Sequence, residues 1–426
     1  MFNLNKTEQS WALYDWANSA YSLTITTAVL PLYFKSVFQN AGGSAAVSTA
    51  YWGYASSIST LFLAIMAPIL GTVADYKGYK KKFFNMFFII GIIATACLSF
   101  VPDNNWILLL GFYILSAIGF SGTNIFYDAF LVDVTQEEKM DRVSTLGFGL
   151  GYIGSTIPFI ISMAIIMLQQ LKMLPLSAAA ASKISFFITA VWWLIFTIPM
   201  IKNVKQIHGI EIEPRPVKKS FIRILHTFKN IKKHRKVFLF LLAYFFYIDG
   251  VDTIIKMSSA YGADLGIKPA SLLLILLITQ FVAFPCAIIY GRLAQRFKGK
   301  IMLYVGIIIY TVICIYAFFL KTTLDFWILA MLVGTSQGGI QALSRSYFGK
   351  LVPKENSNEF FGFYNIFGKF AAVMGPFLMG IVTQITEKSN YGVFSIILLF
   401  VVGGLILLRV PENSEPVDTS ETISLN

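Results

Sequence analysis

Charged side chains are scarce in this sequence: Asp, Glu, Lys and Arg make up 13% of the 426 residues, whereas 56% are hydrophobic. A mean hydropathy of +0.68 excludes a soluble domain, because such a domain needs far more polar surface. In lipid, only helices and closed barrels satisfy their own backbone polar groups. The apolar runs are continuous rather than alternating, so the sequence predicts an all-helical protein that crosses a membrane many times.

Cysteine and histidine are also rare. Cys97, Cys286 and Cys314 all lie in apolar runs, so they predict no disulfide framework. The three histidines all fall in the polar segment 202–236, outside the apolar runs. That distribution argues against an intramembrane metalloenzyme. No nucleophile and base grouping and no metal-ligand spacing occurs either, so we expect no enzyme, no metal and no cofactor.

Twelve apolar runs are long enough to cross a hydrocarbon core of roughly 30 Å, which takes about 20 residues. They are residues 9–38, 47–75, 83–102, 105–133, 143–170, 184–202, 237–262, 269–297, 300–320, 324–350, 357–386 and 390–409. The order predicts an N-terminal six-helix bundle (1–201), a cytoplasmic basic linker (202–236), a C-terminal six-helix bundle (237–411) and a disordered acidic cytoplasmic tail (412–426).

The two halves repeat each other weakly but in order. Gly71 and Pro158 in the first half match Gly291 and Pro376 in the second, and the string YDWANS in the first span matches IDGVDT in the seventh. Six helices, a basic loop and six helices of the same pattern are typical of duplicated transporters.

The formal net charge of +12 is distributed by side of the membrane. From Lys202 to Lys236 there are eleven Lys and Arg against two acids, and further basic clusters occur at 80–82 and 292–300. All fall on the same side of a twelve-span count. The positive-inside rule therefore predicts a multi-pass protein of the cell (cytoplasmic) membrane with both termini in the cytoplasm, and it removes the need for a nucleic-acid partner.

The string GTVADYKGYKKK at 71–82 is the most specific motif. Its glycines, Gly71 and Gly78, allow close approach of helices, and Asp75 is free to accept hydrogen bonds from a helix N-terminus. Here the chain resembles the major facilitator superfamily, in which this aspartate belongs to a cytoplasmic latch. The alternative is a basic turn that only sets topology.

A second charged turn, LVDVTQEEKMDRV at 131–143, follows the fourth span. In the superfamily an acid and an arginine at this place relay the latch. We therefore expect Arg142 to pair with Asp75 or Asp133. A solvated charged loop without a mechanical role is the alternative.

Polar side chains recur inside five spans, where an ionised group costs at least about 2.5 to 3.5 kcal/mol unless it faces water or a partner. They are Asp15 and Asn18 in the first span, Asn124 and Asp128 in the fourth, Asp249, Asp252 and Lys256 in the seventh, Gln337, Gln341 and Arg345 in the tenth, and Asn365 and Lys369 in the eleventh. Spans 1, 4, 7 and 10 line the central cavity of the superfamily, so the resemblance places these side chains along a substrate path.

Structural pairing is the alternative for some of these groups. Asp252 and Lys256 are four residues apart on one helical face and can pair with each other. Asp128 and Arg345 lie near the cytoplasmic ends of their spans, where a salt bridge would close a gate.

A closer resemblance rests on WALYDWANSAY at 11–21, DGVDTI at 249–254, GGIQALSRSYF at 338–348 and EFFGFYNIFGKFAAVMGP at 359–376. These strings are similar to the vacuolar effluxer family related to autophagy proteins, with its bacterial members. The similarity covers nearly the whole membrane region. The family's eukaryotic members are associated with amino-acid export from the vacuole.

These observations predict a secondary active transporter that works by alternating access on small polar solutes, most of all amino acids, with proton-coupled efflux. Carboxylates at 15, 249 and 252 would receive an ammonium, and Lys256 or Lys369 a carboxylate. Asp249 is the first candidate for the proton-carrying group and Asp15 the second. The expected partners are a small-molecule substrate, protons and the lipid bilayer, and the superfamily's usual state is a monomer.

Two other functions stay open. An aromatic content of 15% also suits an exporter or flippase of amphipathic cargo such as a lipid, lysolipid or drug. The basic and apolar residues at the end of the segment 202–236 also suit an amphipathic helix on an anionic leaflet, in a membrane sensor or scaffold that does not transport.

Overall fold

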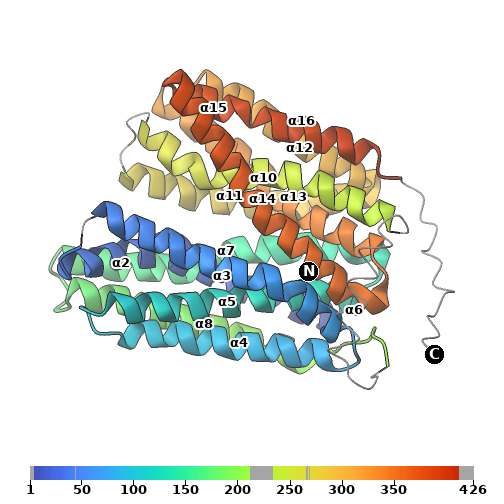
Figure 1. Ribbon diagram of the computed structural model, residues 1–426, viewed down its shortest axis with the longest axis horizontal. Coiled ribbons are helices and arrows are strands. Elements are labelled where there is room, and N and C mark those ends of the chain that lie inside the picture. Colours follow the sequence, from blue (N-terminus) through green and yellow to red (C-terminus); the bar gives the residue numbers. More distant parts are fainter. Residues whose placement is uncertain (1–3, 44, 212–233, 265–266, 268, 412–426) are drawn as a thin grey trace.

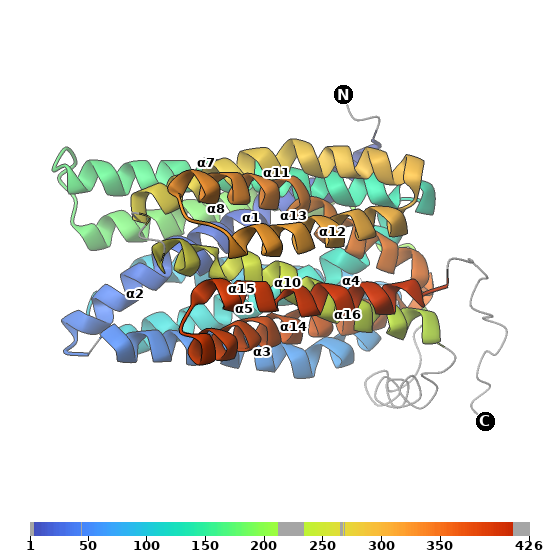
Figure 2. The same cartoon turned by 90° about the horizontal axis from the view of Figure 1, so that it is seen from above.

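Long helices run side by side along the molecule in the computed structural model, which describes residues 4–43, 45–211, 234–264, 267 and 269–411 (Figures 1 and 2). The helices are α1 (Lys6–Ala20), the π-helix η1 (Tyr21–Ala28), α2 (Val29–Asn40), α3 (Ala45–Ala74), α4 (Tyr79–Cys97), η2 (Leu98–Phe100), α5 (Trp106–Ala129), α6 (Leu131–Val134), α7 (Glu137–Gln170), α8 (Ala178–Asn203), α10 (Arg235–Asp264), α11 (Pro269–Phe297), α12 (Gly299–Phe318), α13 (Thr323–Leu351), η3 (Lys354–Asn356), α14 (Ser357–Thr386), α15 (Ser389–Ser395) and α16 (Ile397–Leu408).

Twelve membrane spans follow from this order. In the described part of the chain, 11 helices are long and apolar enough to cross a membrane. The continuous run α1, η1 and α2 forms one more span, which the π-helix interrupts. The predicted fold class, an all-helical membrane protein with twelve spans in two bundles, is therefore confirmed.

The two halves of the chain form two bundles, shown in blue to green and in yellow to red in Figure 1. Helices α1 to α8 pack with one another, as do α10 to α16, and the bundles meet mainly where α3 contacts α14 and α7 contacts α11. The starts of α1, α4 and α14 and the end of α16 lie at the same end of the molecule, which we name the terminal end.

Local sequence explains where key helices begin and how closely they pack. A capping box starts α1: the Asn5 side chain accepts from Glu8 N, and the Glu8 carboxylate accepts from Asn5 N, both at 2.8 Å. Gly91 on α4 faces Gly119 on α5: a Cβ on Gly119 would overlap the Gly91 backbone, and a Cβ on Gly91 would overlap the Trp193 side chain. Small residues at this crossing let two membrane helices touch, as packing in lipid requires.

The π-helix η1 widens the first span beside the space between the bundles. Its bonds run over five residues, and the Thr27 hydroxyl donates to the carbonyl of Ser22 at 2.9 Å. Such segments are rare and are frequent at functional sites.

The start of the linker is ordered along the α3/α4 turn. Ile210 N donates to the carbonyl of Asp75 at 2.9 Å, and Lys77 N donates to the carbonyl of Ile210 at 3.0 Å. The Gln206 side chain accepts from Gly78 N at 2.9 Å. Residues 212–233 and 412–426 lie outside the described residues, so the amphipathic helix and the disordered tail expected there stay predictions.

Candidate functional site

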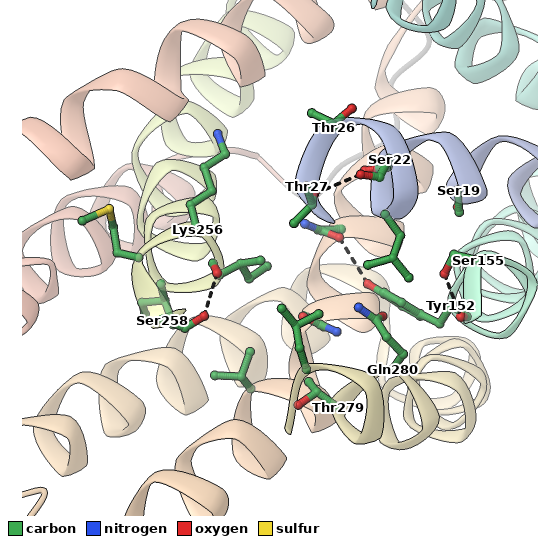
Figure 3. A pocket seen from close by; sticks show the side chains of 18 of the residues that line it. Ser19, Ser22, Thr26, Thr27, Tyr152, Ser155, Lys256, Ser258, Thr279 and Gln280 are labelled. Carbon is green, nitrogen blue, oxygen red and sulfur yellow. Dashed lines mark hydrogen bonds between the residues drawn. The ribbon is translucent and has the colours of Figure 1, made fainter. Parts of the chain in front are cut away.

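A partly open cavity of about 960 Å³ lies between the two bundles. Its wall from the first half is rich in hydroxyl groups. These come from Ser19, Tyr21, Ser22, Thr26, Thr27, Ser56, Ser59, Thr60, Tyr113, Ser121, Tyr152 and Ser155. Figure 3 shows several of them facing the cavity from η1 and its neighbours. This wall offers many hydrogen-bond donors and acceptors without a free charge.

The wall from the second half is mostly apolar. Its apolar side chains are Ile254, Ile255, Met257, Leu272, Ile275, Leu276, Ile313, Ala317, Phe326, Leu329, Ala330, Val333, Met379, Val393 and Ile396. Lys256 is an exception on this wall, and its side chain extends from α10 toward the cavity (Figure 3). Thr279, Gln280, Gln337 and Gln341 add neutral polar groups.

An inner chamber of about 370 Å³ adjoins the cavity and holds most of the site's charge. The two spaces share Lys256 and Gln341 in their walls. The charged side chains that line the chamber are Asp128, Asp252, Lys256, Arg345 and Lys369, and Asn365 lies beside them. Of the residues expected to bind substrate, the structure thus brings Asp252, Lys256, Gln341, Asn365 and Lys369 together, with Gln337 in the adjoining cavity.

Arg345 closes the chamber toward the terminal end. Its Nη2 lies 3.1 Å from Asp15 Oδ2 on α1, and its Nη1 lies 3.2 Å from Asp128 Oδ1 on α5. Its Nε donates to the Ser144 hydroxyl on α7 at 3.0 Å. The guanidinium also lies over the ring of Trp11 at 4.7 Å, a cation–π contact. One arginine of the second bundle is therefore held by three helices of the first.

Asp15 was expected at the substrate path, and the structure gives it two kinds of contact. It lines the cavity, yet its carboxylate is committed to Arg345. Asp128, expected at a gate, also accepts from Arg345, and the Asn365 side chain lies 3.5 Å from its other oxygen.

A second contact between the bundles lies closer to the terminal end and was missed from the sequence. Asp141 on α7 pairs with Lys350 on α13 at 2.6 Å and accepts from the Ser346 hydroxyl at 2.6 Å. Asp141 stands next to Arg142, which was chosen instead. Asp141 lies on the buried face of α7, one turn before Ser144 and Thr145, and its partners lie in the second bundle, so spacing within this helix could not have found it.

Asp75 forms a third contact between the bundles. Its Oδ1 accepts from the backbone N of Asn358 at 2.9 Å and from the Asn358 side chain at 3.0 Å, at the start of α14. This is the helix N-terminus that the motif predicted as the partner of Asp75. Gly71 packs so closely that a Cβ there would overlap the Asn358 carbonyl. Gly78 has a φ of 82°, which ends the turn before α4.

Asp133 and Lys80 form a fully buried ion pair next to this turn, with Nζ 2.7 Å from Oδ2. Lys80 Nζ also donates to the Ser357 hydroxyl of the other bundle at 3.1 Å. Asp133 Oδ1 accepts from the backbone N of His208 at 2.7 Å. Burial alone would raise the pKa of Asp133, but the Lys80 ammonium and the hydrogen bonds from His208 hold that pKa below its usual range. The pairing of Arg142 with Asp75 or Asp133 stays a prediction.

Three residues that were expected to contact substrate lie outside the walls of both spaces. Asn18 and Asn124 bond to each other at 2.7 Å and tie α1 to α5 inside the first bundle. Asp249 is fully buried and accepts from Gly375 N on α14 at 2.9 Å. None of the three lines the cavity or the chamber. These side chains were assigned from helical spacing and from the spans that line the cavity in the superfamily, and neither distinguishes a neighbouring helix from a water-filled space.

Asp252, Lys256 and Lys369 behave differently from Arg345. Within the described ranges, no ion pair within 4 Å reaches any of them. The alternative in which Asp252 and Lys256 pair along α10 is therefore not what the structure shows.

The chain is similar to a known protein family and to transporters of other organisms. The family described as "Vacuole effluxer Atg22 like" matches residues 4–137 and 132–419. The MFS-type transporter YxiO of Bacillus subtilis (strain 168) is 64% identical over 414 residues, which cover 97% of each chain. Autophagy-related protein 22 of Saccharomyces cerevisiae is 24% identical and covers 82% of this chain and 75% of its own.

Solved structures share the fold. A bacterial homologue of the iron transporter ferroportin in an outward-facing state superposes with a TM-score of 0.70 at 14% identity, over 96% of this chain and 99% of that one. The proton:xylose symporter XylE gives a TM-score of 0.71 at 9% identity, over 95% of both chains.

Proposed function

Because this chain belongs to the Atg22-like vacuole effluxer family, within the major facilitator superfamily, we propose that it carries small polar solutes, most of all amino acids, by proton-coupled alternating access and in the direction of efflux. The observation that supports this best is a charged chamber between two bundles whose contacts concentrate at one end. Breaking the contacts of Arg345, Asp141 and Asp75 and closing the opposite end would expose the same chamber to the other side.

The charges of the chamber suit a zwitterion. Lys256 and Lys369 are donors for a carboxylate, and Asp252 is an acceptor for an ammonium. These groups lie on two adjacent helices of one bundle, α10 and α14, so a bound amino acid would move with that bundle.

The proton step belongs to Asp15 in this proposal. Its carboxylate lines the cavity and pairs with Arg345, so protonation removes a charge that holds the bundles together. Asp249 is the second candidate. Its Oδ2 is buried without a hydrogen-bond partner, so a proton there would act through α14 and not through contact with substrate.

We infer the membrane orientation from the basic residues. Lys77, Lys80, Lys81 and Lys82 lie at the terminal end, as do the starts of both bundles. The positive-inside rule assigns this end to the cytoplasm of a bacterial cell and makes the conformation described here outward-facing.

Uptake of a labelled amino-acid panel into proteoliposomes, with and without an imposed pH gradient, tests the function. We expect gradient-stimulated flux of some amino acids that Asp15→Asn abolishes. Asp249→Asn tests the second carrier, and Lys321→Gln, on the exposed connection before α13, is the matched control. Amino-acid flux that does not depend on the pH gradient would reject proton coupling but would leave the transport function in place.

An amphipathic cargo is the second candidate, and the apolar wall of the second bundle is the observation that favours it. A lipid or drug would lay its apolar part on that wall and its polar part on the hydroxyl wall. Folded protein that moves a fluorescent lysolipid but no amino acid would establish this function instead.

A further inference from the structure

Three ionisable side chains of the inner chamber stand apart from the ion pairs of the described residues. Arg345 pairs with Asp15 at 3.1 Å and with Asp128 at 3.2 Å, so each of these three side chains has a partner of opposite charge. Among the described residues, Asp252, Lys256 and Lys369 take part in no ion pair within 4 Å, although all line the same chamber.

Unpaired charges at this depth are costly. An ionised group inside a membrane protein is tolerated where it faces water or awaits a partner. A chamber of about 370 Å³ has room for water around these three groups. They mark the place where a ligand's own charges replace that water.

The three groups do not balance. Two are cations and one is an anion, so the unpaired charge is 2 − 1 = +1. Asp252 and Lys256 are one helical turn apart on α10, with Cα atoms separated by about 6 Å along the axis. Lys369 faces them from α14, the neighbouring helix. The pattern is one acceptor and two donors around a small volume.

We propose that the chamber is specific for acidic amino acids, solutes with one ammonium and two carboxylates. The ammonium pairs with Asp252, and each carboxylate pairs with one of the two lysines. Such a solute has a net charge of −1, which balances the +1 of Asp252, Lys256 and Lys369. The volume lies at the small end of the range of ligand pockets, about 300–1,000 Å³, as suits a solute of this size.

Other amino acids leave a charge unmatched. A neutral amino acid supplies one carboxylate, so Lys256 or Lys369 stays unpaired and desolvated. A basic amino acid adds a second cation to a site that already has an excess of one. The neutral polar groups nearby, Gln341 and Asn365, can bond to either kind of solute and do not decide between them.

This inference rests on the proposed function. Pairs of amino acids of nearly equal shape but different charge test the inference separately from that function. We would measure uptake of glutamate against glutamine, and of aspartate against asparagine, in proteoliposomes with the full-length protein. We expect glutamate to be favoured at least about tenfold, the difference that about 1.4 kcal/mol of charge-assisted contact provides.

The variant Lys369→Gln should reduce the preference for glutamate over glutamine. We expect glutamate flux to fall by a larger factor than glutamine flux in Lys369→Gln, and Lys369→Arg to retain the preference. A second measurement needs no vesicle: the increase in thermal midpoint of the purified protein when glutamate or glutamine is added reports the binding of each. Lys82→Gln, an exposed lysine at the terminal end, is the control.

Equal transport of glutamate and glutamine by the wild type would overturn the inference and leave the amino-acid carrier in place. So would Lys369→Gln if it lowered both fluxes by the same factor. The absence of flux and of binding for every amino acid, from folded protein, would overturn the proposed function together with this inference.

Discussion

Arg345 on α13 and Asp15 on α1 meet at 3.1 Å, although 330 residues separate them in the sequence. The contact joins one bundle to the other on the side of the cavity that faces the terminal end. Asp128 shares the same guanidinium, so two carboxylates of the first bundle depend on one cation of the second. Removing this cation should therefore weaken the closed arrangement of the two bundles.

Arg345→Gln should open the terminal end. The substitution leaves Asp15 and Asp128 close together without a cation, and breaking a buried pair in this way costs about 3–5 kcal/mol. Spin labels at Lys82 and Gln295, exposed at the terminal end of the two bundles, report the separation. We expect a longer distance to become dominant in the variant.

Arg345→Lys is the informative control for that measurement. Lysine keeps the charge but lacks the forked donors that reach two carboxylates at once. We expect an intermediate distance distribution. Unchanged distances in Arg345→Gln would mean that Asp141 and Asp75 hold the bundles closed without Arg345.

Gly71→Ala should weaken the same closed state by sterics alone. A Cβ at Gly71 would overlap the carbonyl oxygen of Asn358, so α14 must move away from α3, at a cost of about 1–3 kcal/mol. Gly53→Ala is the matched control, because it lies on the same helix with no atom within 4 Å of its Cβ position. The distance between spin labels at Lys82 and Gln295 should increase in Gly71→Ala and stay unchanged in Gly53→Ala. An increase in both variants would point to a general effect on α3.

The sequence predicts the membrane spans well, because a run of about 20 apolar residues has few other structures open to it. It also identifies Asp75, Asp128 and Arg345, since charge is rare in such runs. The faces of these helices are less predictable. Asp249 and Asp252 are three residues apart, yet Asp249 faces Gly375 on α14 while Asp252 faces the chamber.

The reason is that the partner of Asp249 lies 126 residues away. A Cβ at Gly375 would overlap Asp249 and Thr253, so the close approach depends on a glycine in another helix. Spacing within one helix contains no information about that glycine. The same holds for Asp141, whose importance depends on Ser346 and Lys350 in the second bundle.

Lys80→Met should lower the thermal midpoint of the purified protein. The substitution leaves the buried Asp133 carboxylate without its cation, and removing one partner of a buried pair costs about 3–5 kcal/mol. The double variant Lys80→Met with Asp133→Leu removes both charges and should reverse most of the decrease in thermal midpoint. A double variant no more stable than Lys80→Met would show that the hydrogen bonds of Asp133 to residues 207 and 208 contribute as much as the ion pair.

Acid should destabilise the wild type through Asp133 in a defined range. The Lys80 ammonium and His208 outweigh burial and hold the pKa of Asp133 below its usual range, about 3.9 in an unfolded chain. A carboxyl whose pKa is lower in the folded state contributes stability above the unfolded value, and that contribution is lost as the pH falls through the folded value. We therefore expect the thermal midpoint of the wild type to fall more steeply than that of Asp133→Asn below about pH 4. Other carboxylates titrate in both proteins, so the difference between the two curves isolates Asp133, and parallel curves would contradict its assignment.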